Sequence, residues 1–199
     1  MKLKKLTPYY KAKARARLRT YFDLATEKHI EDGMLWYSQA NKLVDDLSLE
    51  FNMCTPEQIA GIISALSPRN KWERNIYDTT QVLRAVEKGK DPDEIKVCTF
   101  NTNKHKAFEI ARGNLNIDHS SRKTYSFVKN IANLDSDYVT IDVWHLRAMF
   151  GKTVESGLTP SRYDELAKIT IEEASEVGLL GYQYQAIIWE CIRERDDLI

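Results

Sequence analysis

Asp142 and Lys123 are the two residues of this sequence whose types and positions point most directly to covalent chemistry. Asp142 precedes an apolar stretch, residues 143–150, that is expected to form a helix, and Lys123 lies nineteen residues earlier. A carboxylate can stabilise developing positive charge or activate a nucleophile, and a lysine with a lowered pKa can attack carbon. Asp is also a favoured helix cap, and a lysine near a helix start is ordinarily solvated, so the residue types alone leave both interpretations open.

The patterns that would position these residues are helical. Apolar residues recur at helical spacing after Pro8 and again between Asp32 and Phe51. The segment Thr55-Pro56-Glu57-Gln58 combines a cap, a proline at the first helical position and a glutamine that can close a capping box, so it predicts a core helix over residues 56–66. Further helices are expected over residues 72–86, 103–112, 120 or 121 to 133, 143–150, from Pro160 onward and 184–194, with a short helical turn after Asp91.

The remaining signals concern the fold class. Residues 138–141 are expected to form an extended approach to Asp142, and Gly178 and Gly181 are expected to break the chain before the last helix. The sequence shows no convincing β-alternation, no glycine-rich phosphate loop and no internal repeat. It therefore predicts an all-α fold of nine or ten helices and disfavours a kinase, a Rossmann enzyme or an OB-fold.

Composition indicates an ordinary folded domain, since 43% of the 199 residues are hydrophobic and 29% are charged. No apolar run approaches the length of a membrane helix, and the first twenty residues lack the apolar stretch of a signal peptide, so a cytoplasmic protein is expected. Cys54, Cys98 and Cys191 are far apart, which suggests reduced side chains rather than disulfides or a metal site. Neither a metal nor a cofactor is expected.

Charge is distributed unevenly although the formal net charge is zero. The first twenty residues contain eight basic side chains and no acidic one, whereas the other 179 contain 21 basic and 29 acidic residues. Such segregation is typical of polyanion binding, although a solvated helix end or an organellar transit peptide would also fit. The basic residues are Lys2, Lys4, Lys5, Lys11, Lys13, Arg15, Arg17 and Arg19.

Four motifs occur in a suggestive order. Arg122-Lys123-Thr124 is followed by the segment from Ile141-Asp142 to Gly151, and two stretches lie upstream, residues 62–69 with Asn75 and residues 103–110. Together they resemble the helix-hairpin-helix DNA glycosylases of the endonuclease III superfamily. That family has a Leu-Ser-Ala-Gln segment, an Asn-Ser-Lys-Ala helix, a hairpin ending in a Gly-Arg-Lys-Thr-like stretch, and an Asp that heads a helix ending in Leu-Gly.

The resemblance implies a bilobal helical glycosylase-like fold within a single domain. The central lobe would comprise residues of about 55–134, and residues 1–54 plus 135–199 would form the second lobe, with residues 1–20 as a basic segment. Two departures are clear. The family's glycine-rich hairpin turn is replaced by Ile117-Asp118-His119-Ser120-Ser121, and its four-Cys iron-sulfur loop is absent, since only Cys191 lies in that region. The chain therefore resembles a divergent member without the iron-sulfur loop.

A closer local similarity is to a phage-associated branch of these proteins, on residues 66–69, 123–127 and 140–144, with Trp72 and Asn130-Ile131. Proteins of that branch are proposed to act in thymine hypermodification as α-glutamyl/putrescinyl thymine pyrophosphorylases. The resemblance implies a modified thymine or uracil in double-stranded DNA as substrate, a small amine or amino acid as co-substrate, and the host cytoplasm as location if the protein is phage-encoded.

The resemblance assigns the catalytic roles to Asp142 and Lys123. Asp142 would stabilise an oxocarbenium-like charge during base excision, or deprotonate an amine that displaces pyrophosphate, and Lys123 would form a Schiff base or bind the leaving anion. A flipped base would need aromatic or apolar walls, and Arg69-Asn70 would form a wedge into the DNA. The residues expected to bind DNA or substrate are Ser67, Arg69, Asn70, Trp72, Asn75, Lys104, Tyr125, Trp144, His145, Arg147 and Gln185.

Three functions remain open from the sequence. The first is an enzyme that excises or elaborates a DNA base. The second is a non-catalytic DNA-binding module on a degenerate glycosylase scaffold, which the missing hairpin glycines favour. The third is a helical interaction protein whose basic N-terminal helix binds an acidic partner.

Overall fold

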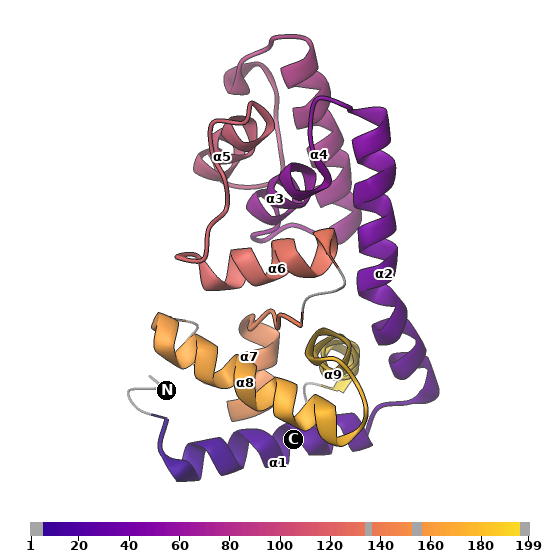
Figure 1. The fold of residues 1–199 in the computed structure, drawn as a ribbon, viewed down its shortest axis with the longest axis vertical. Coiled ribbons are helices and arrows are strands. Elements are labelled where there is room, and N and C mark those ends of the chain that lie inside the picture. The colour runs from indigo at the N-terminus through magenta and orange to yellow at the C-terminus, as the bar shows by residue number, and fades with distance from the viewer. Residues whose placement is uncertain (1–5, 134–136, 153–156, 196–199) are drawn as a thin grey trace. The chain divides into compact units, whose positions relative to one another are not determined.

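The fold is all-α, as predicted. A computed structural model describes residues 6–133, 137–152 and 157–195, and these contain nine α-helices, one 3-10 helix and no strand (Figure 1). No helix in these ranges combines the length and apolar character needed to cross a membrane. In chain order the elements are α1 (Pro8–Asp23), α2 (Glu27–Glu50), α3 (Pro56–Leu66), α4 (Trp72–Glu87), η1 (Pro92–Glu94), α5 (Asn101–Ala111), α6 (Arg122–Ala132), α7 (Val143–Phe150), α8 (Pro160–Glu176) and α9 (Gly181–Arg195).

The chain divides into two compact units. Unit 1 comprises residues 1–40 and 134–199, and unit 2 comprises residues 41–133. The division at residues 40 and 41 falls inside α2, so one continuous helix contributes to both units. Asp142 belongs to unit 1 and Lys123 to unit 2, and each is described within its own unit.

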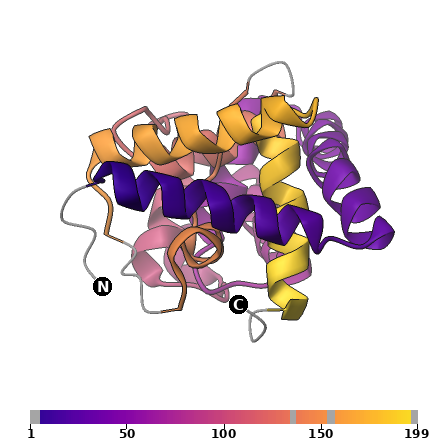
Figure 2. The same ribbon diagram turned by 90° about the horizontal axis from the view of Figure 1, so that it is seen from below.

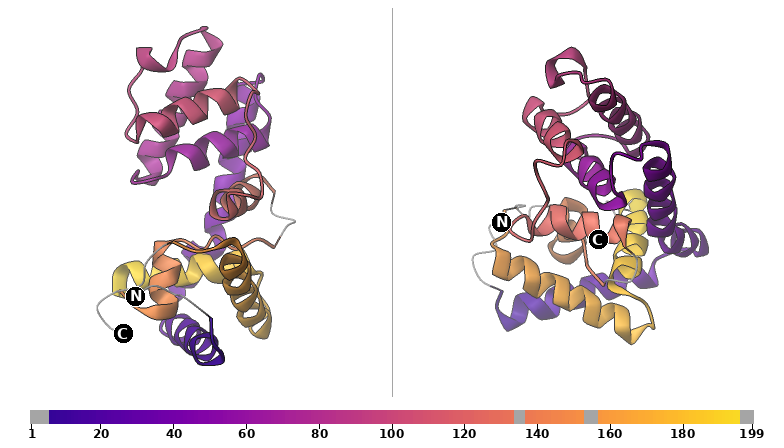
Figure 3. Two further views of the ribbon diagram at one scale, coloured as in Figure 1. Left: turned by 90° about the vertical axis from the view of Figure 1, so that its left-hand side faces the viewer. Right: turned by 45° about the horizontal axis from the view of Figure 1, so that its top comes forward.

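Unit 2 is built around α3, whose start the sequence predicts correctly. The Thr55 side chain accepts a 3.2 Å hydrogen bond from the N–H of Gln58, while the Gln58 side chain accepts a 2.8 Å bond from the N–H of Thr55. This reciprocal capping satisfies two backbone donors that a helix start leaves unpaired. Every residue of the helix from Ile59 to Leu66 is buried, and the helix packs against α4, α5 and α6, which Figure 3 shows from two directions. The predicted core position is therefore confirmed.

Unit 1 packs α1, α7, α8 and α9 around a common core that includes Leu18, Leu146, Leu166 and Ile188. Figure 2 shows α1 and α8 lying side by side. Basic side chains of α1 form ion pairs with acidic side chains of α8, so this charge contributes to packing within the unit. The pairs are Lys11 with Glu165, Arg15 with Glu172 and Glu173, and Arg19 with Glu173. Of the other basic residues of the N-terminus, Lys13 and Arg17 are partly buried on α1, and Lys2, Lys4 and Lys5 lie outside the described residues.

Two glycines allow helices to approach other elements closely, and one of them corrects a predicted helix boundary. Gly181 does not break the chain but begins α9, where a Cβ would come within 2.8 Å of side-chain atoms of Ile171 and Val139. Gly33 lies inside α2, where a Cβ would approach the backbone N of Ile187 to 2.6 Å. Both glycines permit close contacts between elements, which outweigh the intrinsic cost of glycine in a helix.

The start of α2 also differs from the prediction. The helix begins at Glu27, five residues before the predicted Asp32, because Thr26 and His29 cap it reciprocally. The Thr26 hydroxyl accepts from the His29 N–H at 3.3 Å, and the Nδ1 atom of His29 accepts from the Thr26 N–H at 3.2 Å. Histidine takes the place of the usual Glu or Gln in this capping arrangement, so the standard sequence signature is absent.

Candidate functional site

Asp142 caps the N-terminus of α7, as its position in the sequence predicts. Its Oδ1 atom accepts a 2.8 Å hydrogen bond from the backbone N–H of His145, and the residue is only partly buried. The preceding segment is fixed by Tyr163 of α8, whose hydroxyl accepts from the Ile141 N–H at 3.0 Å and donates to the Val139 carbonyl at 2.9 Å. The carboxylate is therefore held in a defined position at the positive end of a helix.

His145 lies behind this carboxylate, inside unit 1. It is 1% exposed, and its Nε2 atom is 2.9 Å from the Thr170 hydroxyl. Burial lowers the pKa of His145 to about 3, so the ring is neutral at physiological pH. A buried neutral imidazole does not touch DNA in this arrangement, and the structure gives His145 a supporting position rather than the predicted binding position.

Trp144 and Arg147 are partly buried residues of α7, the helix that Asp142 caps. The guanidinium carbon of Arg147 is 4.7 Å from the ring centroid of Trp144, which is a cation–π contact. The C-terminal end of the same helix is held by Arg17 of α1, whose Nε atom donates to the Ala148 carbonyl at 2.8 Å. Three predicted site residues, Asp142, Trp144 and Arg147, are thus brought together on one short helix.

A second group of predicted residues lies in unit 2, in the loop between α3 and α4. Arg69 is exposed and has a φ of 59°, the one positive φ found at a non-glycine position among the described residues. Its guanidinium carbon is 5.4 Å from the ring centroid of Phe100, a side chain that is 51% exposed. A non-glycine residue in this conformation is strained, so the loop is held by its surroundings.

Asp78 of α4 supplies much of that support. It is fully buried, and its carboxylate accepts hydrogen bonds from Asn70 Nδ2 at 3.1 Å, Arg74 Nε at 2.9 Å and the Cys98 N–H at 2.7 Å. One carboxylate therefore joins the loop after α3, the first turns of α4 and the segment before α5. Buried charges require such partners, because an uncompensated carboxylate in the interior is costly.

Phe100 is a residue that the motif analysis missed. It directly precedes α5 and is one of the few large hydrophobic side chains in the described chain that are more than half exposed. Its neighbour Thr99 donates to the Pro68 carbonyl at 3.1 Å, which links the two loops near Arg69. The available signal was a phenylalanine between a polar segment and a helix start, but its pairing with Arg69 depends on contacts between residues far apart in the sequence.

Lys123 is exposed at the second position of α6. The loop before it contains Asp118, whose Oδ1 atom accepts from the N–H of Ser120 at 2.8 Å and from its hydroxyl at 2.5 Å. These hydrogen bonds are the main cause of the lowered pKa of Asp118, and the charges of Lys106 and His119 contribute less. The loop therefore keeps a negative charge where the glycosylase family places a phosphate-binding turn. A phosphate is disfavoured at this point of the loop.

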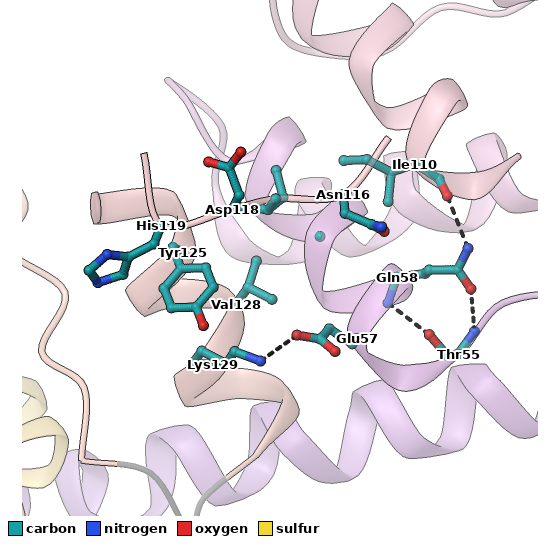
Figure 4. Close-up of a pocket in the computed structure, with 12 residues that line it drawn as sticks. Thr55, Glu57, Gln58, Ile110, Asn116, Asp118, His119, Tyr125, Val128 and Lys129 are labelled. Carbon is teal, nitrogen blue, oxygen red and sulfur yellow. Dashed lines mark hydrogen bonds and ion pairs between the residues drawn. The ribbon is translucent and has the colours of Figure 1, made fainter. Parts of the chain in front are cut away.

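Tyr125 lines a cavity of about 450 Å³ between α3, the loop before α6 and α6 itself (Figure 4). Its ring centroid lies 5.2 Å from that of His119, and Lys129 Nζ lies 5.4 Å from it while contacting Glu57 Oε1 at 2.5 Å. The cavity is large enough for a small organic molecule. Of the predicted site residues, Tyr125 alone lines it.

Several predicted binding residues are internal. Asn75, Lys104 and Gln185 are each 5% exposed or less. Asn75 Nδ2 donates to the Ile63 carbonyl at 2.9 Å, Lys104 Nζ donates to the Ile95 carbonyl at 3.1 Å, and Gln185 Oε1 accepts from the Tyr37 hydroxyl at 2.8 Å. These residues shape their surroundings from within. Ser67, partly buried, caps the C-terminus of α3 through its hydroxyl, and Trp72, also partly buried, begins α4.

These features define an all-α protein with two helical units, one presenting Asp142 and the other presenting the Arg69 loop. The chain belongs to the family of unknown function DUF7178, which matches residues 1–196. Neither the curated proteins nor the solved structures include a match to it.

Proposed function

We propose that this protein is an enzyme of glycosylase-like fold that acts on a flipped base in DNA, a modified thymine or uracil. It would either excise the base or elaborate it by nucleophilic displacement, with Asp142 as the key carboxylate. The observation that carries the proposal is the carboxylate of the partly buried Asp142, fixed at the head of α7, the helix that also carries the Trp144–Arg147 pair.

The position of Asp142 suits both reactions. A carboxylate held at a helix N-terminus is favoured in its charged form by the helix dipole, and an ionised carboxylate can stabilise positive charge at the sugar or accept a proton from an amine. Trp144 offers an aromatic surface for a base, and Arg147 offers a cation for a leaving anion. Lys123 keeps its own proposed role as nucleophile or anion-binding residue, which is tested separately below.

The Arg69 loop supports the DNA part of the proposal. Removal of a base from a duplex leaves a gap in the stack, and a side chain that fills it lowers the cost of flipping. Arg69 and Phe100 form an exposed pair of a cation and an aromatic ring on a rigid tip, which is suited to contact both phosphate and base. We therefore assign the wedge to Arg69 together with Phe100, rather than to Arg69 and Asn70, because Asn70 is bound to Asp78.

The central experiment compares the wild-type protein with Asp142→Asn on duplexes containing thymine, uracil, 5-hydroxymethyluracil or its phosphorylated forms, with and without amines. Nucleosides are analysed by mass. Loss of a base would establish excision, and gain of an amine adduct would establish transfer. Asp91→Asn is the matched control, because Asp91 is the N-cap of η1 in unit 2 and Asn is an equally good cap. If none of these substrates is altered in a way that depends on Asp142, the enzymatic proposal is overturned.

A second candidate function is a non-catalytic DNA-binding module, favoured by the loop before α6. That loop contains no glycine between Ile117 and Ser121, and Asp118 is held ionised within it. A module of this kind would bind DNA with strong salt dependence, and Asp142→Asn would leave binding unchanged while no base is altered.

Borohydride trapping tests Lys123 separately, because only a Schiff base would yield a covalent adduct.

A further inference from the structure

Unit 2 carries a second pair of an arginine and an exposed aromatic ring. Hydrogen bonds to the Asp78 carboxylate connect it to the pair of Arg69 and Phe100. The guanidinium carbon of Arg74 lies 5.0 Å from the ring centroid of Tyr77, and Tyr77 is 55% exposed. From this pair, together with Arg69 and Phe100, we infer that unit 2 binds unpaired DNA, with Tyr77 and Phe100 as stacking platforms for bases. The inference rests on the proposed function and names the form of DNA that this surface accepts.

Asp78 places the two pairs in a fixed relationship. Its Oδ1 atom accepts from Arg74, the cation over Tyr77. Its Oδ2 atom accepts from Asn70, the neighbour of Arg69, and from the backbone N–H of Cys98, two residues before Phe100. Because Asp78 is fully buried, water does not compete with these hydrogen bonds. Both pairs are therefore linked to the same carboxylate. Asp78 is therefore a positioning residue for the whole surface.

The charge of this surface fits a nucleic-acid backbone. Lys71 and Lys96 are exposed on the two segments that carry Arg69 and Phe100, and Glu73 is the exposed acidic residue between Lys71 and Arg74. The charge of Asp78 is buried and compensated by Arg74. The surface thus carries three cations that are not paired with Asp78, namely Arg69, Lys71 and Lys96, together with two aromatic rings. Cations combined with aromatic rings are found in sites for single strands.

Exposed ring faces favour unpaired over paired DNA. In a duplex the faces of the bases are covered by neighbouring base pairs, so Tyr77 and Phe100 could reach only backbone and groove edges. In a single strand or a locally open duplex each base has a free face, and its stacking on an aromatic side chain contributes about 1–3 kcal/mol by alanine substitution. A surface built for duplex backbone alone would need the cations but not the rings.

The test is fluorescence anisotropy with a labelled oligodeoxynucleotide of mixed sequence in three forms: single-stranded, fully paired, and paired with a central unpaired bubble. The full chain should bind the single strand and the bubble more tightly than the duplex. Tyr77→Leu and Phe100→Leu should each weaken binding to the single strand by about 5- to 100-fold and alter duplex binding little. Tyr77→Phe should bind as the wild type. Tyr9→Leu is the matched control, because Tyr9 is a 69% exposed aromatic residue in unit 1.

The positioning role of Asp78 is tested by Asp78→Asn with 2-aminopurine in the single strand, whose fluorescence falls when the base stacks. Less quenching at saturating protein, with helical content unchanged by circular dichroism, supports the role, and Arg74→Met gives the same readout if Asp78→Asn fails to fold. Equal affinity for all three DNA forms, or unchanged binding by both leucine variants, overturns the inference. If bases stack on this surface but no base is chemically altered, the proposed enzymatic function is overturned. The inferred DNA-binding surface would still stand, because the binding assay involves no reaction.

Discussion

Glu173 of α8 lies between Arg15 and Arg19 of α1, with its side chain only 1% exposed. Arg15 Nη1 donates to Oε1 of this carboxylate at 2.8 Å, and Arg19 donates to it through two nitrogens. Removing one member of a buried charged network leaves the other charges uncompensated. This contact holds two of the basic side chains of α1 against α8.

We expect Glu173→Gln to lower the free energy of unfolding by about 1–3 kcal/mol, the scale of hydrogen bonds to charged groups. Glu172→Gln is the control, because Glu172 pairs with Arg15 at a side chain that is 42% exposed and should contribute less to stability than the buried Glu173. Urea denaturation measures both. Equal effects of the two variants would contradict the interpretation that burial of Glu173 makes the pairing important.

The same carboxylate predicts a sensitivity to acid. Burial raises the pKa of Glu173, but hydrogen bonds from Arg19 and Arg15 outweigh it, so the pKa falls below its ordinary value of 4.5. A group with a lowered folded pKa contributes stability above its unfolded pKa and loses it as pH falls through the folded value. Wild-type stability should therefore decrease below about pH 4.5, and part of that decrease should be missing in Glu173→Gln. Thermal unfolding at several pH values checks this.

His145 predicts a second loss of stability, which begins at higher pH. Burial lowers its pKa from 6.5 to about 3. Protonation is therefore easier in the unfolded chain, and stability should decrease as pH falls from about 6.5 toward 3. His145→Gln keeps a polar group near Thr170 without a titrating ring, so its stability should vary less between pH 6.5 and 5 than that of the wild type. Identical pH profiles would show that His145 is not the titrating group.

Local sequence patterns predicted the features of the fold that local physics determines. The start of α3 follows from Thr55, Pro56 and Gln58, which are neighbours, and the start of α7 follows from Asp142 in the same way. A capping residue acts within one turn, so its effect can be inferred without the rest of the chain. The all-α class followed from many such signals taken together.

Long-range contacts decided the features that the sequence patterns missed. The place of Gly181 inside α9 depends on its close approach to Ile171 and Val139, and the exposed pair of Arg69 and Phe100 depends on two loops that Asp78 joins. The buried ring of His145 likewise has a distant partner, Thr170 of α8. Residue type suggested a binding role for His145, but only tertiary packing determines whether a side chain reaches the surface.

Gly33 gives a stability test of one such contact. In Gly33→Ala the new Cβ would lie 2.6 Å from the backbone N and Cα of Ile187, so α2 and α9 must move apart. Although alanine favours a helix, we expect a loss of about 1–3 kcal/mol, the cost typical of overpacking. Gly61→Ala is the control, because its Cβ would meet the flexible Ile110 side chain at 3.2 Å. Greater stability of Gly33→Ala would show that the two helices separate easily.

Asp142 has two roles in these arguments, as a helix cap and as the proposed catalytic carboxylate, and a pair of variants separates them. Asp142→Ala removes the hydrogen bond to the His145 N–H and should lower the free energy of unfolding by about 0.5–2 kcal/mol, whereas Asp142→Asn keeps a capping side chain and should be nearly as stable as the wild type. Both variants remove the negative charge, so both should lose activity on the modified duplex, if charge is what the reaction uses. Asp142→Glu retains the charge one methylene further from the helix and should keep part of the activity. Activity that follows stability across the three variants, with Asp142→Asn fully active, would show that Asp142 serves only as a cap.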